Sequence, residues 1–84
     1  MKVINIKDYY ESMGILIDVR HPLDYQKEHD KRSINIYVDK LLASPQKYLS
    51  KDRTYYIICK SGYSSKRAVR FLSFLNYDVV QVVY

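Results

Sequence analysis

The single cysteine of the chain, Cys59, lies where a nucleophile would be well supported. It directly follows residues 55–58, an apolar and β-branched run that is typical of a buried strand. A short polar loop, residues 60–65, comes next and leads into an amphipathic helix. Successive backbone N–H groups of such a loop, together with the helix N-terminus, form a nest for an anion. A thiol held there ionises more easily, because the amides stabilise the thiolate, so we predict that Cys59 is a nucleophile.

The composition of the loop supports this prediction. Gly62 permits a left-handed backbone conformation that would strain other residues. Ser64 or Ser65 is expected to cap the following helix. Positive charge close by in the sequence favours a small anionic substrate. The residues that carry this charge are Lys60, Lys66 and Arg67.

A second interpretation treats Cys59 as a core residue. A lone cysteine beside an apolar strand is often an inert small hydrophobe. Such a cysteine does not need a loop of glycine and serine residues after it, so we place the chemical role first. One cysteine permits no intramolecular disulfide, which fits a reducing cytosol.

The composition is that of one small globular domain, which we assign to residues 1–84. No stretch has the character of a signal peptide or the length and apolarity of a membrane span. We therefore expect a cytoplasmic protein without a membrane partner. The net charge of +5 suggests nucleic-acid binding, but Lys and Arg are spread along the chain without a known binding motif. No nucleic-acid partner is expected.

Strands and helices are predicted to alternate along the chain. Apolar runs predict strands at residues 3–6, 15–19, 33–36, 55–58 and 79–83. Helices or helical turns are predicted at residues 8–12, 22–28, 40–42, 45–49 and 66–75. This order predicts an α/β domain with a mainly parallel central sheet flanked by helices.

Particular residues are expected to mark the helix ends. Asp39 would cap the helix at residues 40–42, and Asn76 tolerates the left-handed conformation that would end the helix at residues 66–75. This last helix has an apolar face that should pack against the sheet. The face consists of Ala68, Phe71, Leu72 and Leu75.

Two blocks of the sequence together resemble a single-domain rhodanese. The first is Ile-Asp-Val-Arg-His-Pro-Leu-Asp-Tyr at residues 17–25, followed by His29 and by Ile-Asn-Ile at residues 34–36. The second is Cys-Lys-Ser-Gly-Tyr-Ser-Ser at residues 59–65. The order and spacing of the blocks match the family, and the resemblance extends from about residue 15 to residue 84.

The resemblance implies a sulfurtransferase that takes a sulfane sulfur onto Cys59 and hands the resulting persulfide to an acceptor. The donor would be a small anion such as thiosulfate, and no cofactor is implied. The acceptor would be an external thiol, cyanide or a protein, because no second cysteine can resolve the persulfide internally. The expected substrate-binding residues are Lys60, Ser61, Gly62, Tyr63, Ser64, Ser65 and Arg67.

Asp18 and Arg20 also match positions of the family. The resemblance implies that they stabilise the fold near the site, and we expect Arg20 to pair with Asp24.

Three features depart from the family pattern. Residues 28–33 stand in place of a Gly-His-Ile-Pro-Gly-Ala type of turn, and Asn76 replaces a glycine. The chain also stops at Tyr84, where the family continues through a Gly-Gly turn into a further helix. We therefore expect one face of the sheet to be open, with lower stability or with a partner or second copy, as in a homodimer, covering that face.

Other functions fit the sequence less well. A phosphatase with the Cys-x5-Arg motif would need arginine where Ser65 stands, and the arginine comes at Arg67 instead. A cysteine hydrolase needs a paired histidine, and nothing places His21 or His29 against Cys59. A metal site is not expected from one cysteine and two histidines without ligand spacing. A non-catalytic rhodanese-like interaction or regulatory module stays open as the alternative.

Overall fold

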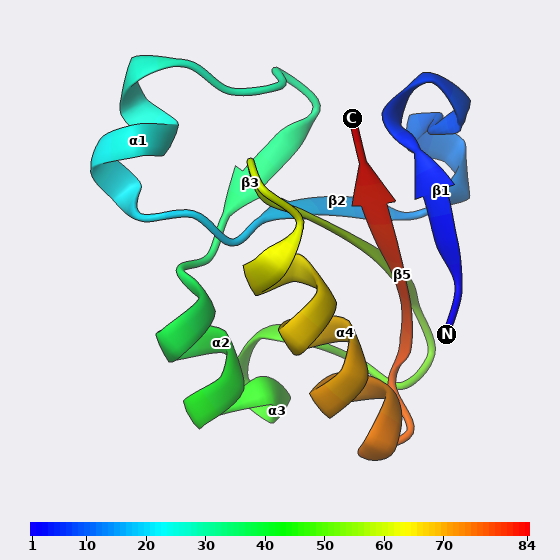
Figure 1. Ribbon diagram of the computed structural model, residues 1–84. Helices are drawn as coiled ribbons and strands as arrows, with labels where there is room; N and C mark the ends of the chain where they lie inside the picture. The colour runs from blue at the N-terminus through cyan, green and yellow to red at the C-terminus, as the bar shows by residue number, and fades with distance from the viewer.

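The computed structural model describes residues 1–84 and has a five-stranded sheet at its centre (Figure 1). The strand order is β1-β5-β4-β2-β3, and every neighbouring pair is parallel. The strands are β1 (Val3–Asn5), β2 (Ile15–Asp18), β3 (Ser33–Asn35), β4 (Thr54–Ile58) and β5 (Asp78–Val83). The predicted α/β fold with a parallel sheet is therefore confirmed. The sheet is parallel throughout.

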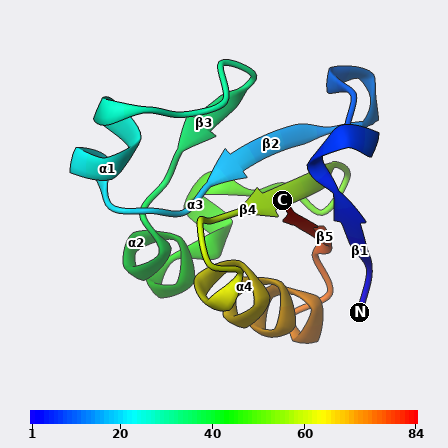
Figure 2. The same cartoon turned by 45° about the horizontal axis from the view of Figure 1, so that its top comes forward.

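Helices cover one face of this sheet. In Figure 2, α2 and α4 lie together beneath the sheet, and α1 stands apart beside β3. Apolar side chains of α2 and α4 pack with those of β2, β4 and β5 into a core of 12 buried residues, and α1 buries none of its residues. The helices are α1 (Pro22–Lys27), α2 (Val38–Ala43), α3 (Pro45–Tyr48) and α4 (Tyr63–Phe74). None of these helices is long and apolar enough to cross a membrane.

A second, smaller core lies on the opposite face of the sheet. Its six residues, among them Tyr9, Leu16 and Tyr56, are at most 7% exposed. The segment that carries Tyr9 contains two short 3-10 turns, η1 (Ile6–Asp8) and η2 (Glu11–Met13). The Tyr9 hydroxyl donates a hydrogen bond to the Gly14 carbonyl oxygen at 2.7 Å. The expectation of an open sheet face is therefore wrong for these six residues, because each of them is buried.

An ion pair organises the turn that replaces the family's glycine- and proline-containing segment. Arg32 donates from Nε to Asp30 Oδ1 at 3.0 Å and from Nη2 to Asp30 Oδ2 at 2.7 Å. Arg32 Nη1 also donates to the Tyr9 carbonyl oxygen at 3.0 Å, which ties the turn to the second core. The hydrogen bond from Arg32 is the main cause that lowers the pKa of Asp30. Side-chain charges thus hold this turn, whose residues 28–33 include no glycine or proline.

The ends of the helices differ in how well the sequence predicts them. Helix α2 begins at Val38 with Tyr37 as its N-cap, so the prediction that Asp39 caps it is wrong. Asp39 lies inside the first turn. Asn76 has a φ of 70° directly after Leu75, the C-cap of α4, which confirms the left-handed end predicted there. The Tyr77 N–H donates to the Leu72 carbonyl oxygen at 3.0 Å and completes this cap.

The buried face of α4 was predicted only in part. Ala68 and Leu72 are buried as expected, but Phe71 is 42% exposed. Ser65 and Val69 take part in the buried face instead. Phe71 lies outside the buried side of α4, which is formed by Ser65, Ala68, Val69 and Leu72.

Candidate active site

Cys59 lies at the carboxyl end of β4, one of the central strands of the sheet. Sites of open parallel sheets gather at this edge, because the loops that leave adjacent strands meet there. The residue is only 5% exposed and contributes to the larger core. The thiol is therefore shielded from bulk water, and the loop that follows supplies its polar neighbours.

Two backbone amides face the sulfur of Cys59. The Gly62 N–H and the Ser65 N–H each lie 3.2 Å from Sγ. Gly62 adopts a φ of 87°, the left-handed conformation predicted for it, and this turn of the chain aims its amide at the sulfur. Fixed amide dipoles stabilise negative charge without having to reorganise. The geometry therefore suits a sulfur atom that becomes anionic.

The hydroxyl group of Ser65 is the third polar neighbour. The Cys59 thiol donates to Ser65 Oγ at 3.3 Å, and that hydroxyl donates to the Gly62 carbonyl oxygen at 3.2 Å. Ser65 does not cap α4, since Gly62 is the N-cap and α4 begins at Tyr63. Ser64 lies in the same first turn and does not cap it either. The prediction of a serine cap is wrong because the helix starts earlier than its apolar pattern suggests.

Gln81 braces the loop from the neighbouring strand β5, and the sequence analysis missed it. Its buried Nε2 donates to the Gly62 carbonyl oxygen at 3.0 Å and to Ser65 Oγ at 3.1 Å. A signal for this role exists in the sequence, because Gln81 interrupts the run of valines at residues 79–83. A polar side chain inside a buried strand needs hydrogen-bond partners nearby. The pattern alone could not say that those partners belong to the cysteine loop.

Asp18 and Arg20 form a structural unit beside the site. Arg20 donates from Nε to Asp18 Oδ1 at 3.0 Å and from Nη2 to Asp18 Oδ2 at 2.8 Å. Arg20 Nη2 also donates to the Glu28 carbonyl oxygen at 2.7 Å. The expected pairing of Arg20 with Asp24 is wrong, because the two-point contact with Asp18 holds the guanidinium. The hydrogen bond to Asp18 is also the main cause that raises the pKa of Arg20.

A cleft of about 970 Å³ opens above the cysteine loop. Cys59, Lys60, Ser61 and Ser64 of the predicted site line it. Side chains of both signs surround it, because α1 and its C-cap residue add two carboxylates as well as a lysine. These further lining residues are Asp24, Lys27 and Glu28.

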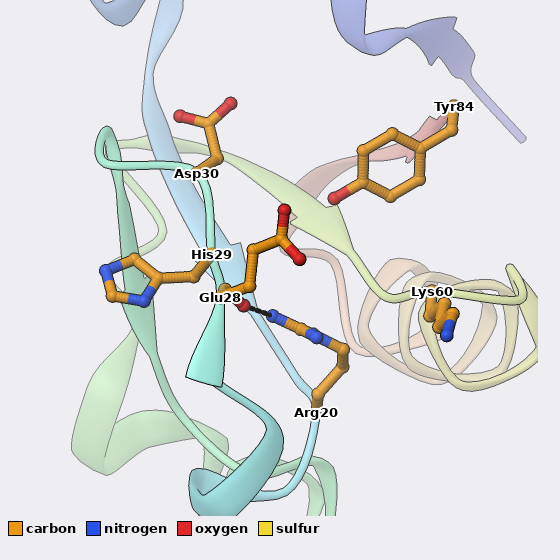
Figure 3. Close-up of a pocket in the computed structure, with 6 residues that line it drawn as sticks. All are labelled: Arg20, Glu28, His29, Asp30, Lys60 and Tyr84. Carbon is orange, nitrogen blue, oxygen red and sulfur yellow. Dashed lines mark hydrogen bonds between the residues drawn. The ribbon is translucent and has the colours of Figure 1, made fainter. Parts of the chain in front are cut away.

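A smaller hollow of about 490 Å³ adjoins the cleft (Figure 3). Figure 3 shows the hydroxyl of Tyr84 and the carboxylate of Glu28 pointing toward each other, while the His29 ring points away. The His29 ring stacks on Tyr25 with 3.7 Å between the ring centroids. His29 is therefore placed as a turn residue and does not approach Cys59.

Three of the predicted substrate-binding or charged residues lie elsewhere. Tyr63, Lys66 and Arg67 line a separate hollow on the outside of α4 and do not line the cleft. Arg67 Nη2 is 3.6 Å from Asp39 Oδ1. Of the three cations expected near the sulfur, only Lys60 lines the cleft. No group of three or more His, Cys, Asp or Glu side chains in the chain is arranged to hold a metal ion.

Comparison with known proteins places this geometry in a family. The family model described as a rhodanese-like domain matches residues 4–84. A rhodanese-related protein from Thermoplasma volcanium has 36% sequence identity over 98% of this chain and 83% of its own, with a TM-score of 0.86. The reduced protein CoADR-RHD of Bacillus anthracis has 32% identity over 96% of this chain and 15% of its own, with a TM-score of 0.84.

A further structure of the same kind is a rhodanese with anions from E. coli. It has 31% identity over 82% of this chain and 82% of its own, with a TM-score of 0.70. No curated protein sequence matches the chain. The match over nearly all residues, together with a cysteine loop at the end of β4, shows that the chain belongs to the rhodanese-like domain family.

Proposed function

We propose that the protein is a sulfurtransferase that carries a sulfane sulfur on Cys59. The observation that carries this proposal is the pair of backbone N–H groups, from Gly62 and Ser65, directed at Sγ from 3.2 Å. A persulfide bears negative charge on its outer sulfur near neutral pH, and preorganised amides are the groups that stabilise such charge. The family includes sulfurtransferases, and its E. coli member was solved with anions.

The first step transfers sulfur from the donor to the protein. The thiolate of Cys59 attacks the outer sulfur of thiosulfate and forms a new S–S bond. The sulfur–sulfur bond of thiosulfate breaks, and sulfite leaves with the bonding electron pair. Cys59 then carries a persulfide, and no external oxidant or reductant is needed. The cleft of about 970 Å³ gives a donor of this size ample room.

The second step releases the sulfur to an acceptor. A thiolate or cyanide attacks the outer sulfur of the persulfide, and Cys59 leaves as a thiolate. The products are a persulfide of the acceptor or thiocyanate. The acceptor must be external because Cys59 is the chain's only cysteine.

The hydrogen bonds among the buried polar groups can rearrange when the charge on the sulfur changes. When Cys59 is a thiol, the Ser65 hydroxyl donates to the Gly62 carbonyl oxygen. When the sulfur is anionic, the hydroxyl can turn its proton to the sulfur. The Gly62 carbonyl oxygen then keeps its hydrogen bond from Gln81 Nε2 at 3.0 Å, so no buried acceptor loses its partner.

Hydrolysis by a cysteine–histidine pair has less support. His21 lines the cleft, but its Nδ1 accepts a hydrogen bond from the Leu23 N–H at 3.1 Å and serves as the N-cap of α1. Neither ring nitrogen of His21 makes a hydrogen bond to Cys59. A non-catalytic interaction module is the second candidate function, and it is favoured by the low exposure of Cys59.

Thiocyanate formation from thiosulfate and cyanide tests the proposal. We expect steady turnover by the wild-type protein and none above background by Cys59→Ser. Polysulfide and cysteine persulfide serve as further donors in the same assay. If the folded wild-type protein matches Cys59→Ser with all three donors, the interaction module becomes the better account.

A further inference from the structure

Helix α4 carries a solvent-exposed face made of aromatic and basic side chains. These side chains recur every three or four residues, so they lie on one side of the helix. The aromatic members are well exposed, with Tyr63 at 74% and Phe74 at 83%. We call this face the outer face of α4, and it consists of Tyr63, Lys66, Arg67, Arg70, Phe71 and Phe74.

The charge on the outer face has one sign. Helix α4 contains no Asp or Glu. Arg67 has a weak ion pair with the exposed Asp39, at 3.6 Å. Lys66 and Arg70 form no ion pair, so their charges face solvent without a counter-charge. An acidic partner would find complementary charge here.

A hollow of about 320 Å³ lies within this face. Tyr63 and Phe71 contribute aromatic rings to it, and the three basic residues of the face complete its lining. The combination suits an apolar side chain that is flanked by carboxylates. Aromatic residues and arginine are also the residue types enriched in protein interfaces.

The outer face adjoins the cysteine loop. Helix α4 begins at Tyr63, the residue directly after Gly62, whose N–H group faces Cys59 Sγ. Tyr63 lines the hollow of the outer face, and the next residue, Ser64, lines the cleft above the cysteine. A partner bound to the outer face would therefore reach the mouth of the cleft.

We propose that the outer face of α4 docks an acidic segment of the protein that accepts sulfur from Cys59. This inference rests on the proposed sulfur transfer and identifies the acceptor as a protein with carboxylates beside its thiol. Complementary charge raises the rate of such encounters. A nucleic acid fits less well, because binding of that kind often involves about 6–10 phosphate contacts. The outer face has three cations on a helix of about 18 Å, and one of them is already paired.

Sulfur transfer to defined peptides tests the proposal. The probe is a short synthetic peptide with one cysteine and one leucine among glutamates, and its control has glutamines in place of the glutamates. We expect the persulfidated wild-type protein to react about tenfold faster with the acidic peptide, which is within the range of electrostatic steering. The rate of sulfur transfer to the neutral thiol 2-mercaptoethanol measures the chemical step without docking.

Charge-reversed variants locate the effect. The faster transfer to the acidic peptide should disappear in Lys66→Glu/Arg70→Glu, while the rate of transfer to 2-mercaptoethanol stays unchanged. The matched control is Lys7→Glu/Lys31→Glu, which changes the net charge equally at exposed residues outside α4 and should keep the preference. Equal rates with the two peptides, or a preference that survives the reversal on α4, would overturn the proposal.

A binding measurement separates docking from catalysis. Fluorescence anisotropy of a labelled acidic peptide, with serine in place of its cysteine, uses the Cys59→Ser protein and requires no sulfur transfer. If peptide binds this protein but wild-type persulfide never forms, the proposed function fails while the docking face stands. If an unrelated single-stranded oligonucleotide of equal charge displaces the peptide at lower concentration, the face belongs to nucleic acid and the proposal is wrong.

Discussion

The cysteine loop and the outer face of α4 meet at Tyr63, but they differ in the groups that they present. The loop presents mainly backbone groups, and the outer face presents side chains. Around Cys59 the backbone provides two of the three polar neighbours of the sulfur, the N–H groups of Gly62 and Ser65. On the outer face, side chains provide both the charge and the apolar contact area. The loop should therefore respond to changes in backbone conformation and buried bracing, and the outer face to changes in charge.

The largest expected effect comes from Gly62→Ala, which alters the backbone of the loop. A left-handed conformation costs an L-residue about 1–2 kcal/mol, so the Gly62 amide should move away from the sulfur. We expect turnover to fall about a hundredfold, the scale on which one donor of this kind acts. The assay is thiocyanate formation.

Asn76→Ala is the matched control for this variant. Asn76 also has a positive φ, and it lies beyond the end of α4 that is remote from the cysteine loop. Urea unfolding should show a loss of stability of about 1–2 kcal/mol for Gly62→Ala and a smaller loss for Asn76→Ala, because asparagine already bears part of that cost. Equal turnover in the two would show that the Gly62 backbone does not matter to the chemistry.

Replacing Gln81 tests the buried brace. Gln81→Met keeps the length of the side chain but removes the donor to Gly62 and Ser65, which should cost about 1–3 kcal/mol of stability. Gln81→Glu also places negative charge against Ser65 Oγ, the hydroxyl that bonds to Cys59 Sγ, so we expect its turnover to be lower than that of Gln81→Met. Turnover that is higher in Gln81→Glu would contradict a site built to hold an anion.

Arg32→Gln should affect stability alone, because Arg32 lies in the turn before β3 and outside the cleft. The hydrogen bond from Arg32 lowers the pKa of Asp30 below its ordinary value of 3.8 in the folded protein, so the Arg32–Asp30 pair stabilises the fold above about that pH. This contribution is lost as the pH falls through the lowered pKa.

Urea unfolding across a range of pH measures this difference. The free energy of unfolding of the wild-type protein should exceed that of Arg32→Gln by about 1–2 kcal/mol at pH 7, and this difference should decrease below pH 3.8. Turnover at pH 7 should be unchanged. A gap that stays constant down to pH 2 would show that the ionised Asp30 is not its source.

The smallest effect is expected from Phe74→Ser on the outer face. The ring is 83% exposed, so the free energy of unfolding should change by less than about 0.5 kcal/mol. Turnover with cyanide should not change, whereas binding of the acidic peptide should weaken. A large loss of stability would mean that Phe74 packs in the core.

The sequence predicted the sheet well because its strands carry clear patterns. Residues 15–17 and 55–58 are apolar runs, and their burial on both faces of a parallel sheet explains why no alternation appears. Asn76 was predictable as the end of α4 because few residues accept a positive φ. These signals are local, so one sequence suffices to find them.

Other features depend on contacts between distant residues. Gln81 reaches the cysteine loop 19 residues earlier in the chain. Lys66 and Arg67 are close to Cys59 in sequence, but the turn of the helix carries them to the outer face. Arg20 prefers Asp18 over Asp24 because a guanidinium makes two parallel hydrogen bonds to the nearer carboxylate. Spacing along the chain could not distinguish these arrangements.

The intact mass of the reduced protein, measured before and after exposure to thiosulfate, tests the central claim most directly. The account predicts a gain of one sulfur atom that cyanide or a thiol removes, and no gain in Cys59→Ser. A folded wild-type protein that gains no sulfur from thiosulfate, polysulfide or cysteine persulfide would contradict sulfur transfer at Cys59.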